Sequence, residues 1–448
     1  MKKMSKLKKT VREASLDVLE SVEKNQSYSN LLLNHAIEKY NIKGPDTGLL
    51  TELTYGTIQR RMTLDYYLAP FINKKVESWV RQLLRLSLYQ MVYLDKIPDR
   101  AILFEAVEIA KRRGHKGIAS MVNGILRSIQ RKGVQSTESI QDPVERLAIE
   151  TSHPEWLVKR WTEQFGVHKT REMCETNITA PLQTARVNTL KTTRDELLES
   201  LTQEGLTVKK SQIAPEAIVS LKGNLAKTDA FRKGLLTIQD ESSMLVAHSL
   251  DVQEGFNVLD SCAAPGGKTT HIAELMGGKG KVLALDLHKH KIKLIEDNAA
   301  RLGLENIESK AHDSRTAGEL FEPESFDRIL VDAPCSGLGV LRRKPDIKYT
   351  KTEKDLESLQ KIQLQILKAV SPLLKKGGIL VYSTCTVDMN ENQGTVKEFL
   401  NQNEGFQPYE LIHLPETVQP FVEENMLQIF PQDFGGDGFF ISCFKKDS

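Results

Sequence analysis

The stretch from Phe256 to Thr270 constrains the fold of this chain more than any other part. It reads F-N-V-L-D-S-C-A-A-P-G-G-K-T-T, so an apolar run of strand length ends at an acidic residue and passes into a Pro-Gly-Gly loop. A segment with helical character, His271 to Met276, follows. A strand, a tight turn and a helix in this order are typical of the first half of a nucleotide-binding α/β domain. The glycines allow a ligand to approach backbone N–H groups, and the first turn of a helix leaves such donors unpaired.

Three kinds of ligand are candidates for this loop. A Walker A phosphate loop requires G-x-x-x-x-G-K-[ST], and Cys262 stands where its first glycine is needed, although Gly267, Lys268 and Thr269 match its end. The dinucleotide pattern G-x-G-x-x-G is absent. S-adenosylmethionine fits better, because the loop can bind its carboxylate and Asp286, at the end of the next apolar run, can accept hydrogen bonds from its ribose. A glycine turn without a ligand would not explain two acidic strand ends at this spacing.

From Gly234 to the C-terminus, short apolar runs alternate with helical patterns, as a doubly wound and mostly parallel sheet requires. The expected strands are 256–260, 281–286, 307–311, 328–332, 379–383 and 439–444. Ligands of such sheets bind beyond the carboxyl ends of the strands. Four aspartates and two cysteines fall there, namely Asp260, Asp286, Asp313, Asp332, Cys335 and Cys385. A single aspartate could equally cap a helix or a turn, but four at successive strand ends favour a binding site.

The front of the chain has a different character. Residues 1–132 have helical periodicity almost throughout, residues 133–151 are expected to be a linker, and residues 152–233 resemble half of a ferredoxin-like α+β arrangement. Residues 1–150 contain 25 Lys and Arg against 17 Asp and Glu, a net charge of +8, whereas the remainder carries −6. The basic clusters Arg60–Arg61 and Lys111–Lys116 would suit contacts with an RNA backbone, although solvated helical faces explain the same excess.

Composition excludes several classes of protein. No apolar run approaches the roughly 18 residues of a membrane span, and the Lys-rich start lacks the apolar stretch of a signal peptide. We therefore expect a soluble, cytoplasmic protein without a membrane partner. The five cysteines, at positions 174, 262, 335, 385 and 443, form neither a disulfide framework nor the paired C-x-x-C spacing of a zinc site. No metal site is expected, and any cysteine that matters should act as a thiol.

Two short motifs carry the chemistry, D-A-P-C-S-G at 332–337 and S-T-C-T at 383–386. Enzymes that methylate an exocyclic amine place a D-P-P-Y-like sequence after the fourth strand, where this chain has a thiol. Carbon 5 of a pyrimidine becomes nucleophilic only after a group adds at carbon 6, and a Cys thiolate can make that addition. A base must then remove the carbon 5 proton so that the sulfur can leave. A lone buried cysteine is usually a small apolar residue, but two beside a cofactor loop favour catalysis.

Together with C-A-A-P-G-G-K at 262–268, these motifs resemble the signature set of the Nop/Sun family of RNA cytosine-5 methyltransferases. The helical front, with L-T-Y-G-T-I-Q-R-R at 53–61, resembles a NusB-like RNA-binding domain. The resemblance covers essentially the whole chain. It implies a Rossmann-like class I methyltransferase domain at 234–448, with a mostly parallel sheet, preceded by a small α+β domain (ferredoxin- or RRM-like) at 152–233 and an all-α NusB-like domain at 1–132.

The resemblance also implies an activity and roles for particular residues. The enzyme would form 5-methylcytosine in 16S ribosomal RNA, at position 967 in the usual numbering of that RNA, through a covalent cysteine intermediate. Cys385 would be the nucleophile, and Cys335 would assist release of the product. Spacing alone does not rank the two, since DNA cytosine-5 methyltransferases attack with the Pro-Cys thiol. The residues implied in S-adenosylmethionine binding are Cys262, Ala263, Ala264, Pro265, Gly266, Gly267, Lys268, Asp286, Asp313 and Asp332.

The expected partner is 16S ribosomal RNA, free or early in assembly, bound by a monomer that does not bind DNA. The basic stretch 342–344, just past Cys335, is either a contact with the substrate strand or an ordinary solvated loop. Two other functions stay open. A transfer RNA cytosine-5 methyltransferase would differ only in lacking the NusB-like front, and a non-catalytic RNA-binding ribosome-assembly factor would have no need of the two cysteines.

Overall fold

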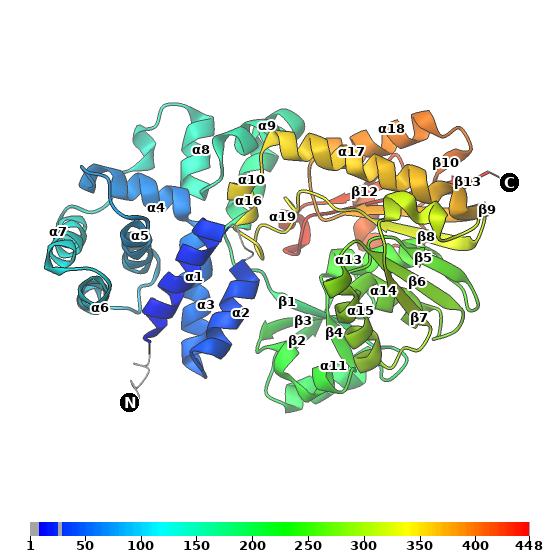
Figure 1. Ribbon diagram of the computed structural model, residues 1–448, viewed down its shortest axis with the longest axis horizontal. Coiled ribbons are helices and arrows are strands. Elements are labelled where there is room, and N and C mark those ends of the chain that lie inside the picture. Colours follow the sequence, from blue (N-terminus) through cyan, green and yellow to red (C-terminus); the bar gives the residue numbers. More distant parts are fainter. Residues whose placement is uncertain (1–8, 26–28, 448) are drawn as a thin grey trace. The chain divides into compact units, whose positions relative to one another are not determined.

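The computed structural model describes residues 9–25 and 29–447 (Figure 1). Contacts divide the chain into two compact units. One comprises Met1–Thr179 with Leu341–Thr350, and the other comprises Ala180–Val340 with Lys351–Ser448. The domain boundaries predicted at 132, 151 and 233 differ from this division and stay predictions, because compact units and evolutionary domains need not coincide.

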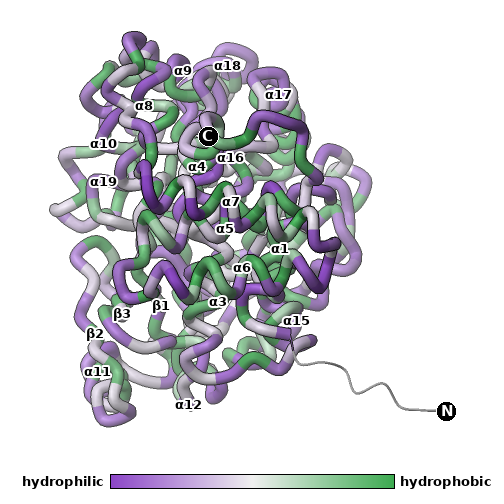
Figure 2. Tube along the Cα trace, turned by 90° about the vertical axis from the view of Figure 1, so that its left-hand side faces the viewer, coloured by the Kyte–Doolittle hydropathy of each residue, from purple (hydrophilic) through white to green (hydrophobic). Residues whose placement is uncertain are grey.

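The first unit is built from helices, and no strand forms in its described part. Apolar residues at helical spacing meet in one core that contains Leu16, Leu53, Leu84, Ile109 and Leu126. Figure 2 shows hydrophobic and hydrophilic residues alternating along helices such as α6 and α7, as amphipathic helices require. The helices are α1 Val11–Asn25, α2 Ser29–Lys39, α3 Pro45–Gln59, α4 Arg61–Leu68, α5 Ser78–Tyr93, α6 Asp99–Arg113, α7 Lys116–Lys132, α8 Pro143–Thr151, α9 Glu155–Phe165, α10 Val167–Asn177 and the short α16 Ile347–Thr350.

Part of the predicted linker forms a helix. The Asp142 side chain accepts hydrogen bonds from the backbone N–H groups of Val144 (2.7 Å) and Glu145 (3.1 Å), so it caps the start of α8. Pro143 occupies the first helical position, where its missing N–H costs nothing. Pro143, inside the stretch 133–151 that was expected to be a linker, therefore opens a helix. Helices α9 and α10, assigned above to the small α+β domain, group with the helical unit.

The second unit begins with a small antiparallel sheet of order β2-β3-β1-β4. This order, with α11 between the first two strands, is the complete ferredoxin-like arrangement, of which the sequence predicted half. The last strand was missed because it has only three residues and follows two very short helices. The elements are β1 Gln183–Val187, α11 Arg194–Gln203, β2 Thr207–Lys210, β3 Ala217–Lys222, η3 Leu225–Lys227, α12 Asp229–Arg232 and β4 Leu236–Ile238.

The larger sheet has the order β11-β12-β13-β9-β8-β5-β6-β7, and β10 also pairs with β13. The neighbouring strands β7, β6, β5, β8 and β9 all run parallel, which confirms the predicted mostly parallel sheet. The strands are β5 Asn257–Asp260, β6 Lys281–Asp286, β7 Ile307–Ala311, β8 Phe326–Asp332, β9 Leu374–Thr384, β10 Phe406–Tyr409, β11 Val422–Glu423, β12 Met426–Ile429 and β13 Phe439–Lys446. The chain order reverses between β5 and β8, so a crevice for ligands is expected at their carboxyl ends.

Helices cover both faces of this sheet (Figure 1). Neighbouring residues of a strand point to opposite faces, so Val258 packs into a core with α13 and α14, whereas Leu259 packs into a core with α17 and α18. The helices are α13 Glu241–Ser249, α14 Gly267–Leu275, α15 Lys289–Leu302, α17 Glu353–Val370, α18 Thr395–Gln402 and α19 Pro431–Phe434. Among the described helices of both units, none is long and apolar enough to cross a membrane.

Candidate active site at the carboxyl ends of the parallel strands

The loop between β5 and α14 is shaped to receive an anionic group. Gly266 has φ 99°, in the left-handed region that glycine favours, and a Cβ there would lie 3.1 Å from the Cα atom of Ile295. Helix α14 begins at Gly267 without a side-chain cap. The N–H groups of its first turn are therefore available to a ligand, and the helix dipole favours a carboxylate there.

Asp286 ends β6 beside this loop. Its Oδ2 atom accepts a hydrogen bond from the N–H of Ala264 (3.3 Å), and its Oδ1 atom accepts one from the N–H of His288 (2.9 Å). Each carboxylate oxygen can accept a second hydrogen bond. Asp286 therefore fixes the loop and still has capacity to bind a hydroxyl pair, as the sequence predicts for the ribose of the cofactor.

Lys268 joins the loop to the fourth parallel strand. Its Nζ atom lies 2.7 Å from Oδ2 of Asp332, and Oδ1 of Asp332 accepts a hydrogen bond from the Ser383 hydroxyl (2.9 Å). Burial disfavours the ammonium form of Lys268, but Asp332, aided by Cys385, outweighs burial and raises the pKa of Lys268. The site thus holds a fixed positive charge between the cofactor loop and the ends of β8 and β9.

Asp260, at the end of β5, supports the loop by hydrogen bonds. Its carboxyl group is fully buried and accepts hydrogen bonds from the Thr269 hydroxyl (2.7 Å) and the Cys262 N–H (3.4 Å). Burial raises the pKa of Asp260 to about 7, the Thr269 hydrogen bond opposes this shift, and Asp332 adds to it. Asp260 was placed among the strand-end acids but not among the residues implied in cofactor binding, and its contacts make it a support of the loop.

The other aspartate, Asp313, follows β7 and is more exposed. It caps the short helix η4 (Ser314–Glu319) by accepting from the N–H of Arg315 (3.0 Å), and it pairs with the Arg315 guanidinium at 2.6 Å. These hydrogen bonds lower the pKa of Asp313. The structure thus shows the capping role that the sequence analysis weighed for it, and its role in cofactor binding stays a prediction.

The two motif cysteines lie together, with their Sγ atoms 3.4 Å apart. The parallel register places Asp332 of β8 opposite Ser383 of β9, so the residues that follow these strands meet at the same edge. The hydrogen bond with Cys385 and burial together raise the pKa of Cys335 well above its usual value. Cys335 is therefore held as a neutral thiol beside Cys385.

The third cysteine of the motifs, Cys262, has a different environment. Its side chain packs at the edge of the core between the sheet and α17, and burial raises the pKa of its thiol. Such a thiol is inert, so any contact of Cys262 with a cofactor involves its backbone. The predicted loop and the residues Lys268, Asp286, Asp332, Cys335 and Cys385 lie at the carboxyl ends of β5, β6, β8 and β9.

Sequence reasoning missed Glu391, which holds the cysteine loop in place. It lies in a single π-helical turn, Asn390–Gly394 (η6), and accepts hydrogen bonds from the N–H of Ser336 (2.8 Å) and the Gln363 amide (3.0 Å). The Ser336 hydroxyl also bonds to the Thr386 hydroxyl at 2.8 Å, which ties the two motifs together. The polar stretch around Glu391 has no periodicity, so the sequence carried no signal for it.

The basic clusters of the helical unit serve largely in internal contacts. Lys111 pairs with Glu108, Arg112 with Glu13, and Arg113 with Asp17 and Glu20. Arg60 stacks on Tyr93, and Arg61 stacks on Tyr349 at 4.2 Å from the ring centre. Many of the basic residues that were expected to bind RNA therefore form ion pairs or cation–π contacts within the helical unit.

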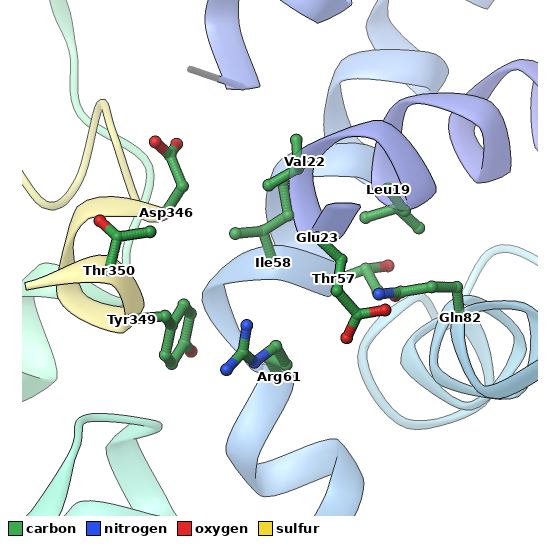
Figure 3. A pocket seen from close by; sticks show the side chains of 10 residues that line it. All are labelled: Leu19, Val22, Glu23, Thr57, Ile58, Arg61, Gln82, Asp346, Tyr349 and Thr350. Atoms are coloured by element: carbon green, nitrogen blue, oxygen red, sulfur yellow. The ribbon is translucent and has the colours of Figure 1, made fainter. Parts of the chain in front are cut away.

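Arg61 and Tyr349 also line a cavity of about 260 Å³ within the helical unit (Figure 3). The segment 341–350, which includes the basic stretch after Cys335, completes this cavity and belongs to the same unit. Arg342 of that stretch donates from Nε to the Thr179 carbonyl (3.3 Å) and from Nη2 to the Thr179 hydroxyl (3.2 Å). The side chains that line the cavity are Leu19, Val22, Glu23, Thr57, Ile58, Arg61, Gln82, Asp346, Tyr349 and Thr350.

The sheet order, the uncapped glycine loop and the acidic residue after β6 define an S-adenosylmethionine-dependent methyltransferase domain of class I. Residues 247–445 match the 16S rRNA methyltransferase RsmB/F family, residues 9–131 match the NusB family, and residues 153–225 match the ferredoxin-like domain of RsmF/B-like methyltransferases. These matches confirm the predicted order of a NusB-like, a ferredoxin-like and a methyltransferase domain.

Full-length relatives give the same result. The probable ribosomal RNA small subunit methyltransferase B of Bacillus subtilis is 57% identical over 445 residues, which cover 98% of this chain and 100% of that protein. The probable ribosomal RNA small subunit methyltransferase B of Synechocystis sp. is 35% identical over 444 residues, 98% of this chain and 99% of that protein. This chain belongs to the ribosomal RNA small subunit methyltransferase B family, whose members are S-adenosylmethionine-dependent enzymes that methylate ribosomal RNA.

Solved structures share the architecture. The crystal structure of PH0851 superposes with a TM-score of 0.85 and 26% identity, covering 99% of this chain and 100% of that one. The structure of NSun6 from Pyrococcus horikoshii with SFG has a TM-score of 0.59 and 25% identity, and it covers 66% of this chain and 98% of that one.

Proposed function

We propose that this enzyme forms 5-methylcytosine in 16S ribosomal RNA, at position 967 in the usual numbering, through a covalent bond between Cys385 and carbon 6 of the target base. The observation that carries the proposal is the pair of thiols 3.4 Å apart beside the buried Lys268 ammonium. An enzyme that methylates an exocyclic amine or a hydroxyl has no use for this pair. A pyrimidine carbon requires addition of a nucleophile at carbon 6 and its later removal.

The cofactor site fits S-adenosylmethionine. The first turn of α14 would bind its carboxylate, Asp286 would bind its ribose hydroxyls, and the loop at 262–268 would enclose it. When bound there, S-adenosylmethionine supplies a methyl group on a positively charged sulfur. The cofactor roles of Asp313 and Asp332 are weaker within this proposal, because Arg315 and Lys268 already pair with them.

Attack begins with the thiolate of Cys385, which the Lys268 ammonium favours by its charge. A bond forms between Sγ and carbon 6, and the electrons of the 5,6 double bond move to carbon 5 and into the ring. Carbon 5 would then bond to the methyl carbon as the bond between that carbon and the sulfonium sulfur breaks, which leaves the sulfur as a neutral thioether. Asp332, fixed by Lys268 and Ser383, is placed at the same strand ends to hold the polar edge of the cytosine.

Release requires two proton movements, which Cys335 can provide. Its pKa is raised, so it stays protonated during attack and can donate its proton to the departing Sγ of Cys385. As its proton moves to Sγ, the Cys335 sulfur takes the proton from carbon 5 in the same step, so that both cysteines end the step as thiols. Loss of that proton restores the 5,6 double bond as the bond between Sγ and carbon 6 breaks.

Bisulfite sequencing of ribosomal and transfer RNA from a strain that lacks this protein tests the assignment of substrate. We expect unmodified cytosine at position 967 of 16S ribosomal RNA, and restoration of 5-methylcytosine by the wild-type gene but not by a Cys385→Ala gene. Loss of the modification from a transfer RNA instead would assign the enzyme to the alternative substrate. We further propose that the enzyme acts in the cytoplasm, on free or early-assembly RNA, as a monomer.

A further inference from the structure

A second cluster of potential ligand groups lies away from the thiols. Glu216 precedes β3 of the ferredoxin-like sheet, whereas His248 and His271 lie on α13 and α14, which pack side by side (Figure 1). Nε2 of His248 is 3.1 Å from both carboxylate oxygens of Glu216, and Nε2 of His271 is 3.0 Å from Oε1. The donor atoms of all three residues lie within 4.8 Å of one another.

Glu216 and His271 are buried, His248 is partly exposed, and the ring nitrogens of His271 are unsatisfied within the described part of the chain. The side chain of His271 is 2% exposed, and neither of its ring nitrogens has a hydrogen-bond partner among the described residues. Buried polar groups without partners are rare and costly. Nε2 of His271 approaches Oε1 of Glu216 to 3.0 Å without the geometry of a hydrogen bond.

The charge of Glu216 also needs a partner. Among the described residues, the two histidines are its only ion-pair neighbours. The nearby Arg186 is engaged elsewhere, since its guanidinium donates to both carboxylate oxygens of Glu274 at 3.0 Å. A carboxylate in this environment requires either a proton shared with an imidazole or a bound cation.

We propose that Glu216, His248 and His271 bind a zinc ion through Oε1 and the two Nε2 atoms. Zinc bonds of about 2.0–2.2 Å to nitrogen and oxygen place tetrahedral ligands roughly 3.3 Å apart. The observed separations of 3.0 and 3.1 Å between Oε1 and the two nitrogens fit that spacing. Neutral imidazole and carboxylate are also the ligand types that zinc takes. A metal ion would give both imidazoles and the carboxylate a partner at once, which a single proton cannot.

The site would join two parts of the second unit. Glu216 directly precedes β3 of the ferredoxin-like sheet, and His271 belongs to the helix whose first turn follows the cofactor loop. A metal ion would hold α14 against that sheet and so fix the loop at 262–268. The sequence predicted no metal site because its three ligands come from separate segments without C-x-x-C or H-x-x-H spacing.

The test uses full-length protein without a polyhistidine tag. After equilibration with zinc and gel filtration, elemental analysis should find equimolar zinc in the wild type, and zinc should raise the Tm of the metal-free protein by about 2 °C or more. Cobalt in place of zinc should give the strong visible absorption of a four-coordinate site, in which a water would complete the three protein ligands. His248→Gln and Glu216→Gln should lose all three signals, while the control His168→Gln, at an exposed position, should keep them.

Failure of the variants to fold would leave the cobalt spectrum and the zinc stoichiometry of the wild type as the deciding measurements. A wild type that binds neither ion and shows no change in Tm would overturn the proposal. The Glu216 carboxylate would then be balanced by a proton on an imidazole.

Discussion

The Nζ atom of Lys268 lies 2.7 Å from Oδ2 of Asp332, which joins the helix after the cofactor loop to the end of the fourth parallel strand. Both residues flank the point where the strand order reverses. The pair places a positive charge that is held in position next to the two thiols. This charge has a measurable consequence for the pH dependence of the reaction.

We expect Lys268→Met to shift the rise of methylation rate with pH upward by roughly one unit or more, because an opposite charge nearby favours the ionised form by that order. Burial opposes the charge of Lys268, but Asp332 and, to a smaller extent, Cys385 raise its pKa, and because attraction between charges is mutual the ammonium favours a Cys385 thiolate. Initial rates at saturating RNA and cofactor would measure the shift. Lys293→Met, at an exposed position on α15, is the control. An unchanged pH profile of the methylation rate in Lys268→Met would show that Lys268 does not influence the ionisation of the nucleophile.

Asp260→Asn should change how stability depends on pH. The native carboxyl group has a pKa of about 7 against 3.8 for an ordinary aspartate, so between these values the native state keeps a proton that the unfolded chain loses. The contribution of Asp260 to the free energy of unfolding therefore falls as pH rises through this window, by about 1.4 kcal/mol per pH unit, and stays at its lowest value above pH 7.

Chemical denaturation followed by circular dichroism at several pH values would measure this slope. The difference between wild type and Asp260→Asn should fall with pH. Asp313→Asn is the matched control, because Arg315 lowers the pKa of that carboxyl group and its contribution runs in the opposite direction. Parallel curves for wild type and Asp260→Asn would mean that Asp260 ionises normally in the folded protein.

Asp286→Ala should weaken binding of S-adenosylmethionine. Hydrogen bonds to a charged acceptor contribute about 1.5–3 kcal/mol, which corresponds to a loss of roughly tenfold to 150-fold in affinity. Calorimetry on the full chain would measure it, with Asp297→Ala on α15 as a control at an exposed position. If the folded Asp286→Ala bound the cofactor with wild-type affinity, Asp286 would serve only to hold the Ala264 and His288 N–H groups.

The exposed face of α7 is the best candidate for contacts with the RNA backbone in the helical unit. Arg127 and Arg131 lie there four residues apart, are exposed, and have no ion-pair partner among the described residues. Replacing both with glutamine should weaken binding of a 16S fragment and reduce the slope of log affinity against log salt by about two. Lys111→Gln is the control, because Lys111 is already paired with Glu108. If the double arginine replacement and Lys111→Gln had equal effects on RNA binding, the RNA would not contact this face of α7.

The parts that the sequence predicted are those with strong local patterns. The expected strands 281–286 and 307–311 have the same bounds as β6 and β7. In β6 this follows from the apolar run V-L-A-L between two charged residues. The short strands β10, β11 and β12 were missed. They have two to four residues each, and pairing with a neighbour rather than their own composition defines them.

In the candidate active site, too, only features defined by neighbouring residues of the sequence could be predicted. The glycine loop and the acidic residues at strand ends could be predicted because each lies within one short contiguous stretch of the sequence. The contact between Cys335 and Cys385, the support by Glu391 and the cluster around Glu216 depend on sheet register and helix packing. Such contacts join segments far apart in the chain, and no pattern within a single sequence records them.

The central claim is that Cys385 attacks the base and Cys335 resolves the adduct. Cys385→Ala should bind RNA and cofactor but form neither product nor a covalent complex, because no thiolate reaches carbon 6. Cys335→Ala should attack and transfer the methyl group and then stall with the protein bonded to RNA through Cys385.

A denaturing gel of each variant with labelled 16S fragment and S-adenosylmethionine distinguishes these outcomes, since the bond between sulfur and carbon survives conditions that remove non-covalent complexes. Cys174→Ala, at a buried thiol of the helical unit, controls for the loss of a cysteine as such. We expect a shifted, RNA-linked band for Cys335→Ala alone. A band for Cys385→Ala and none for Cys335→Ala would exchange the two roles and contradict this expectation.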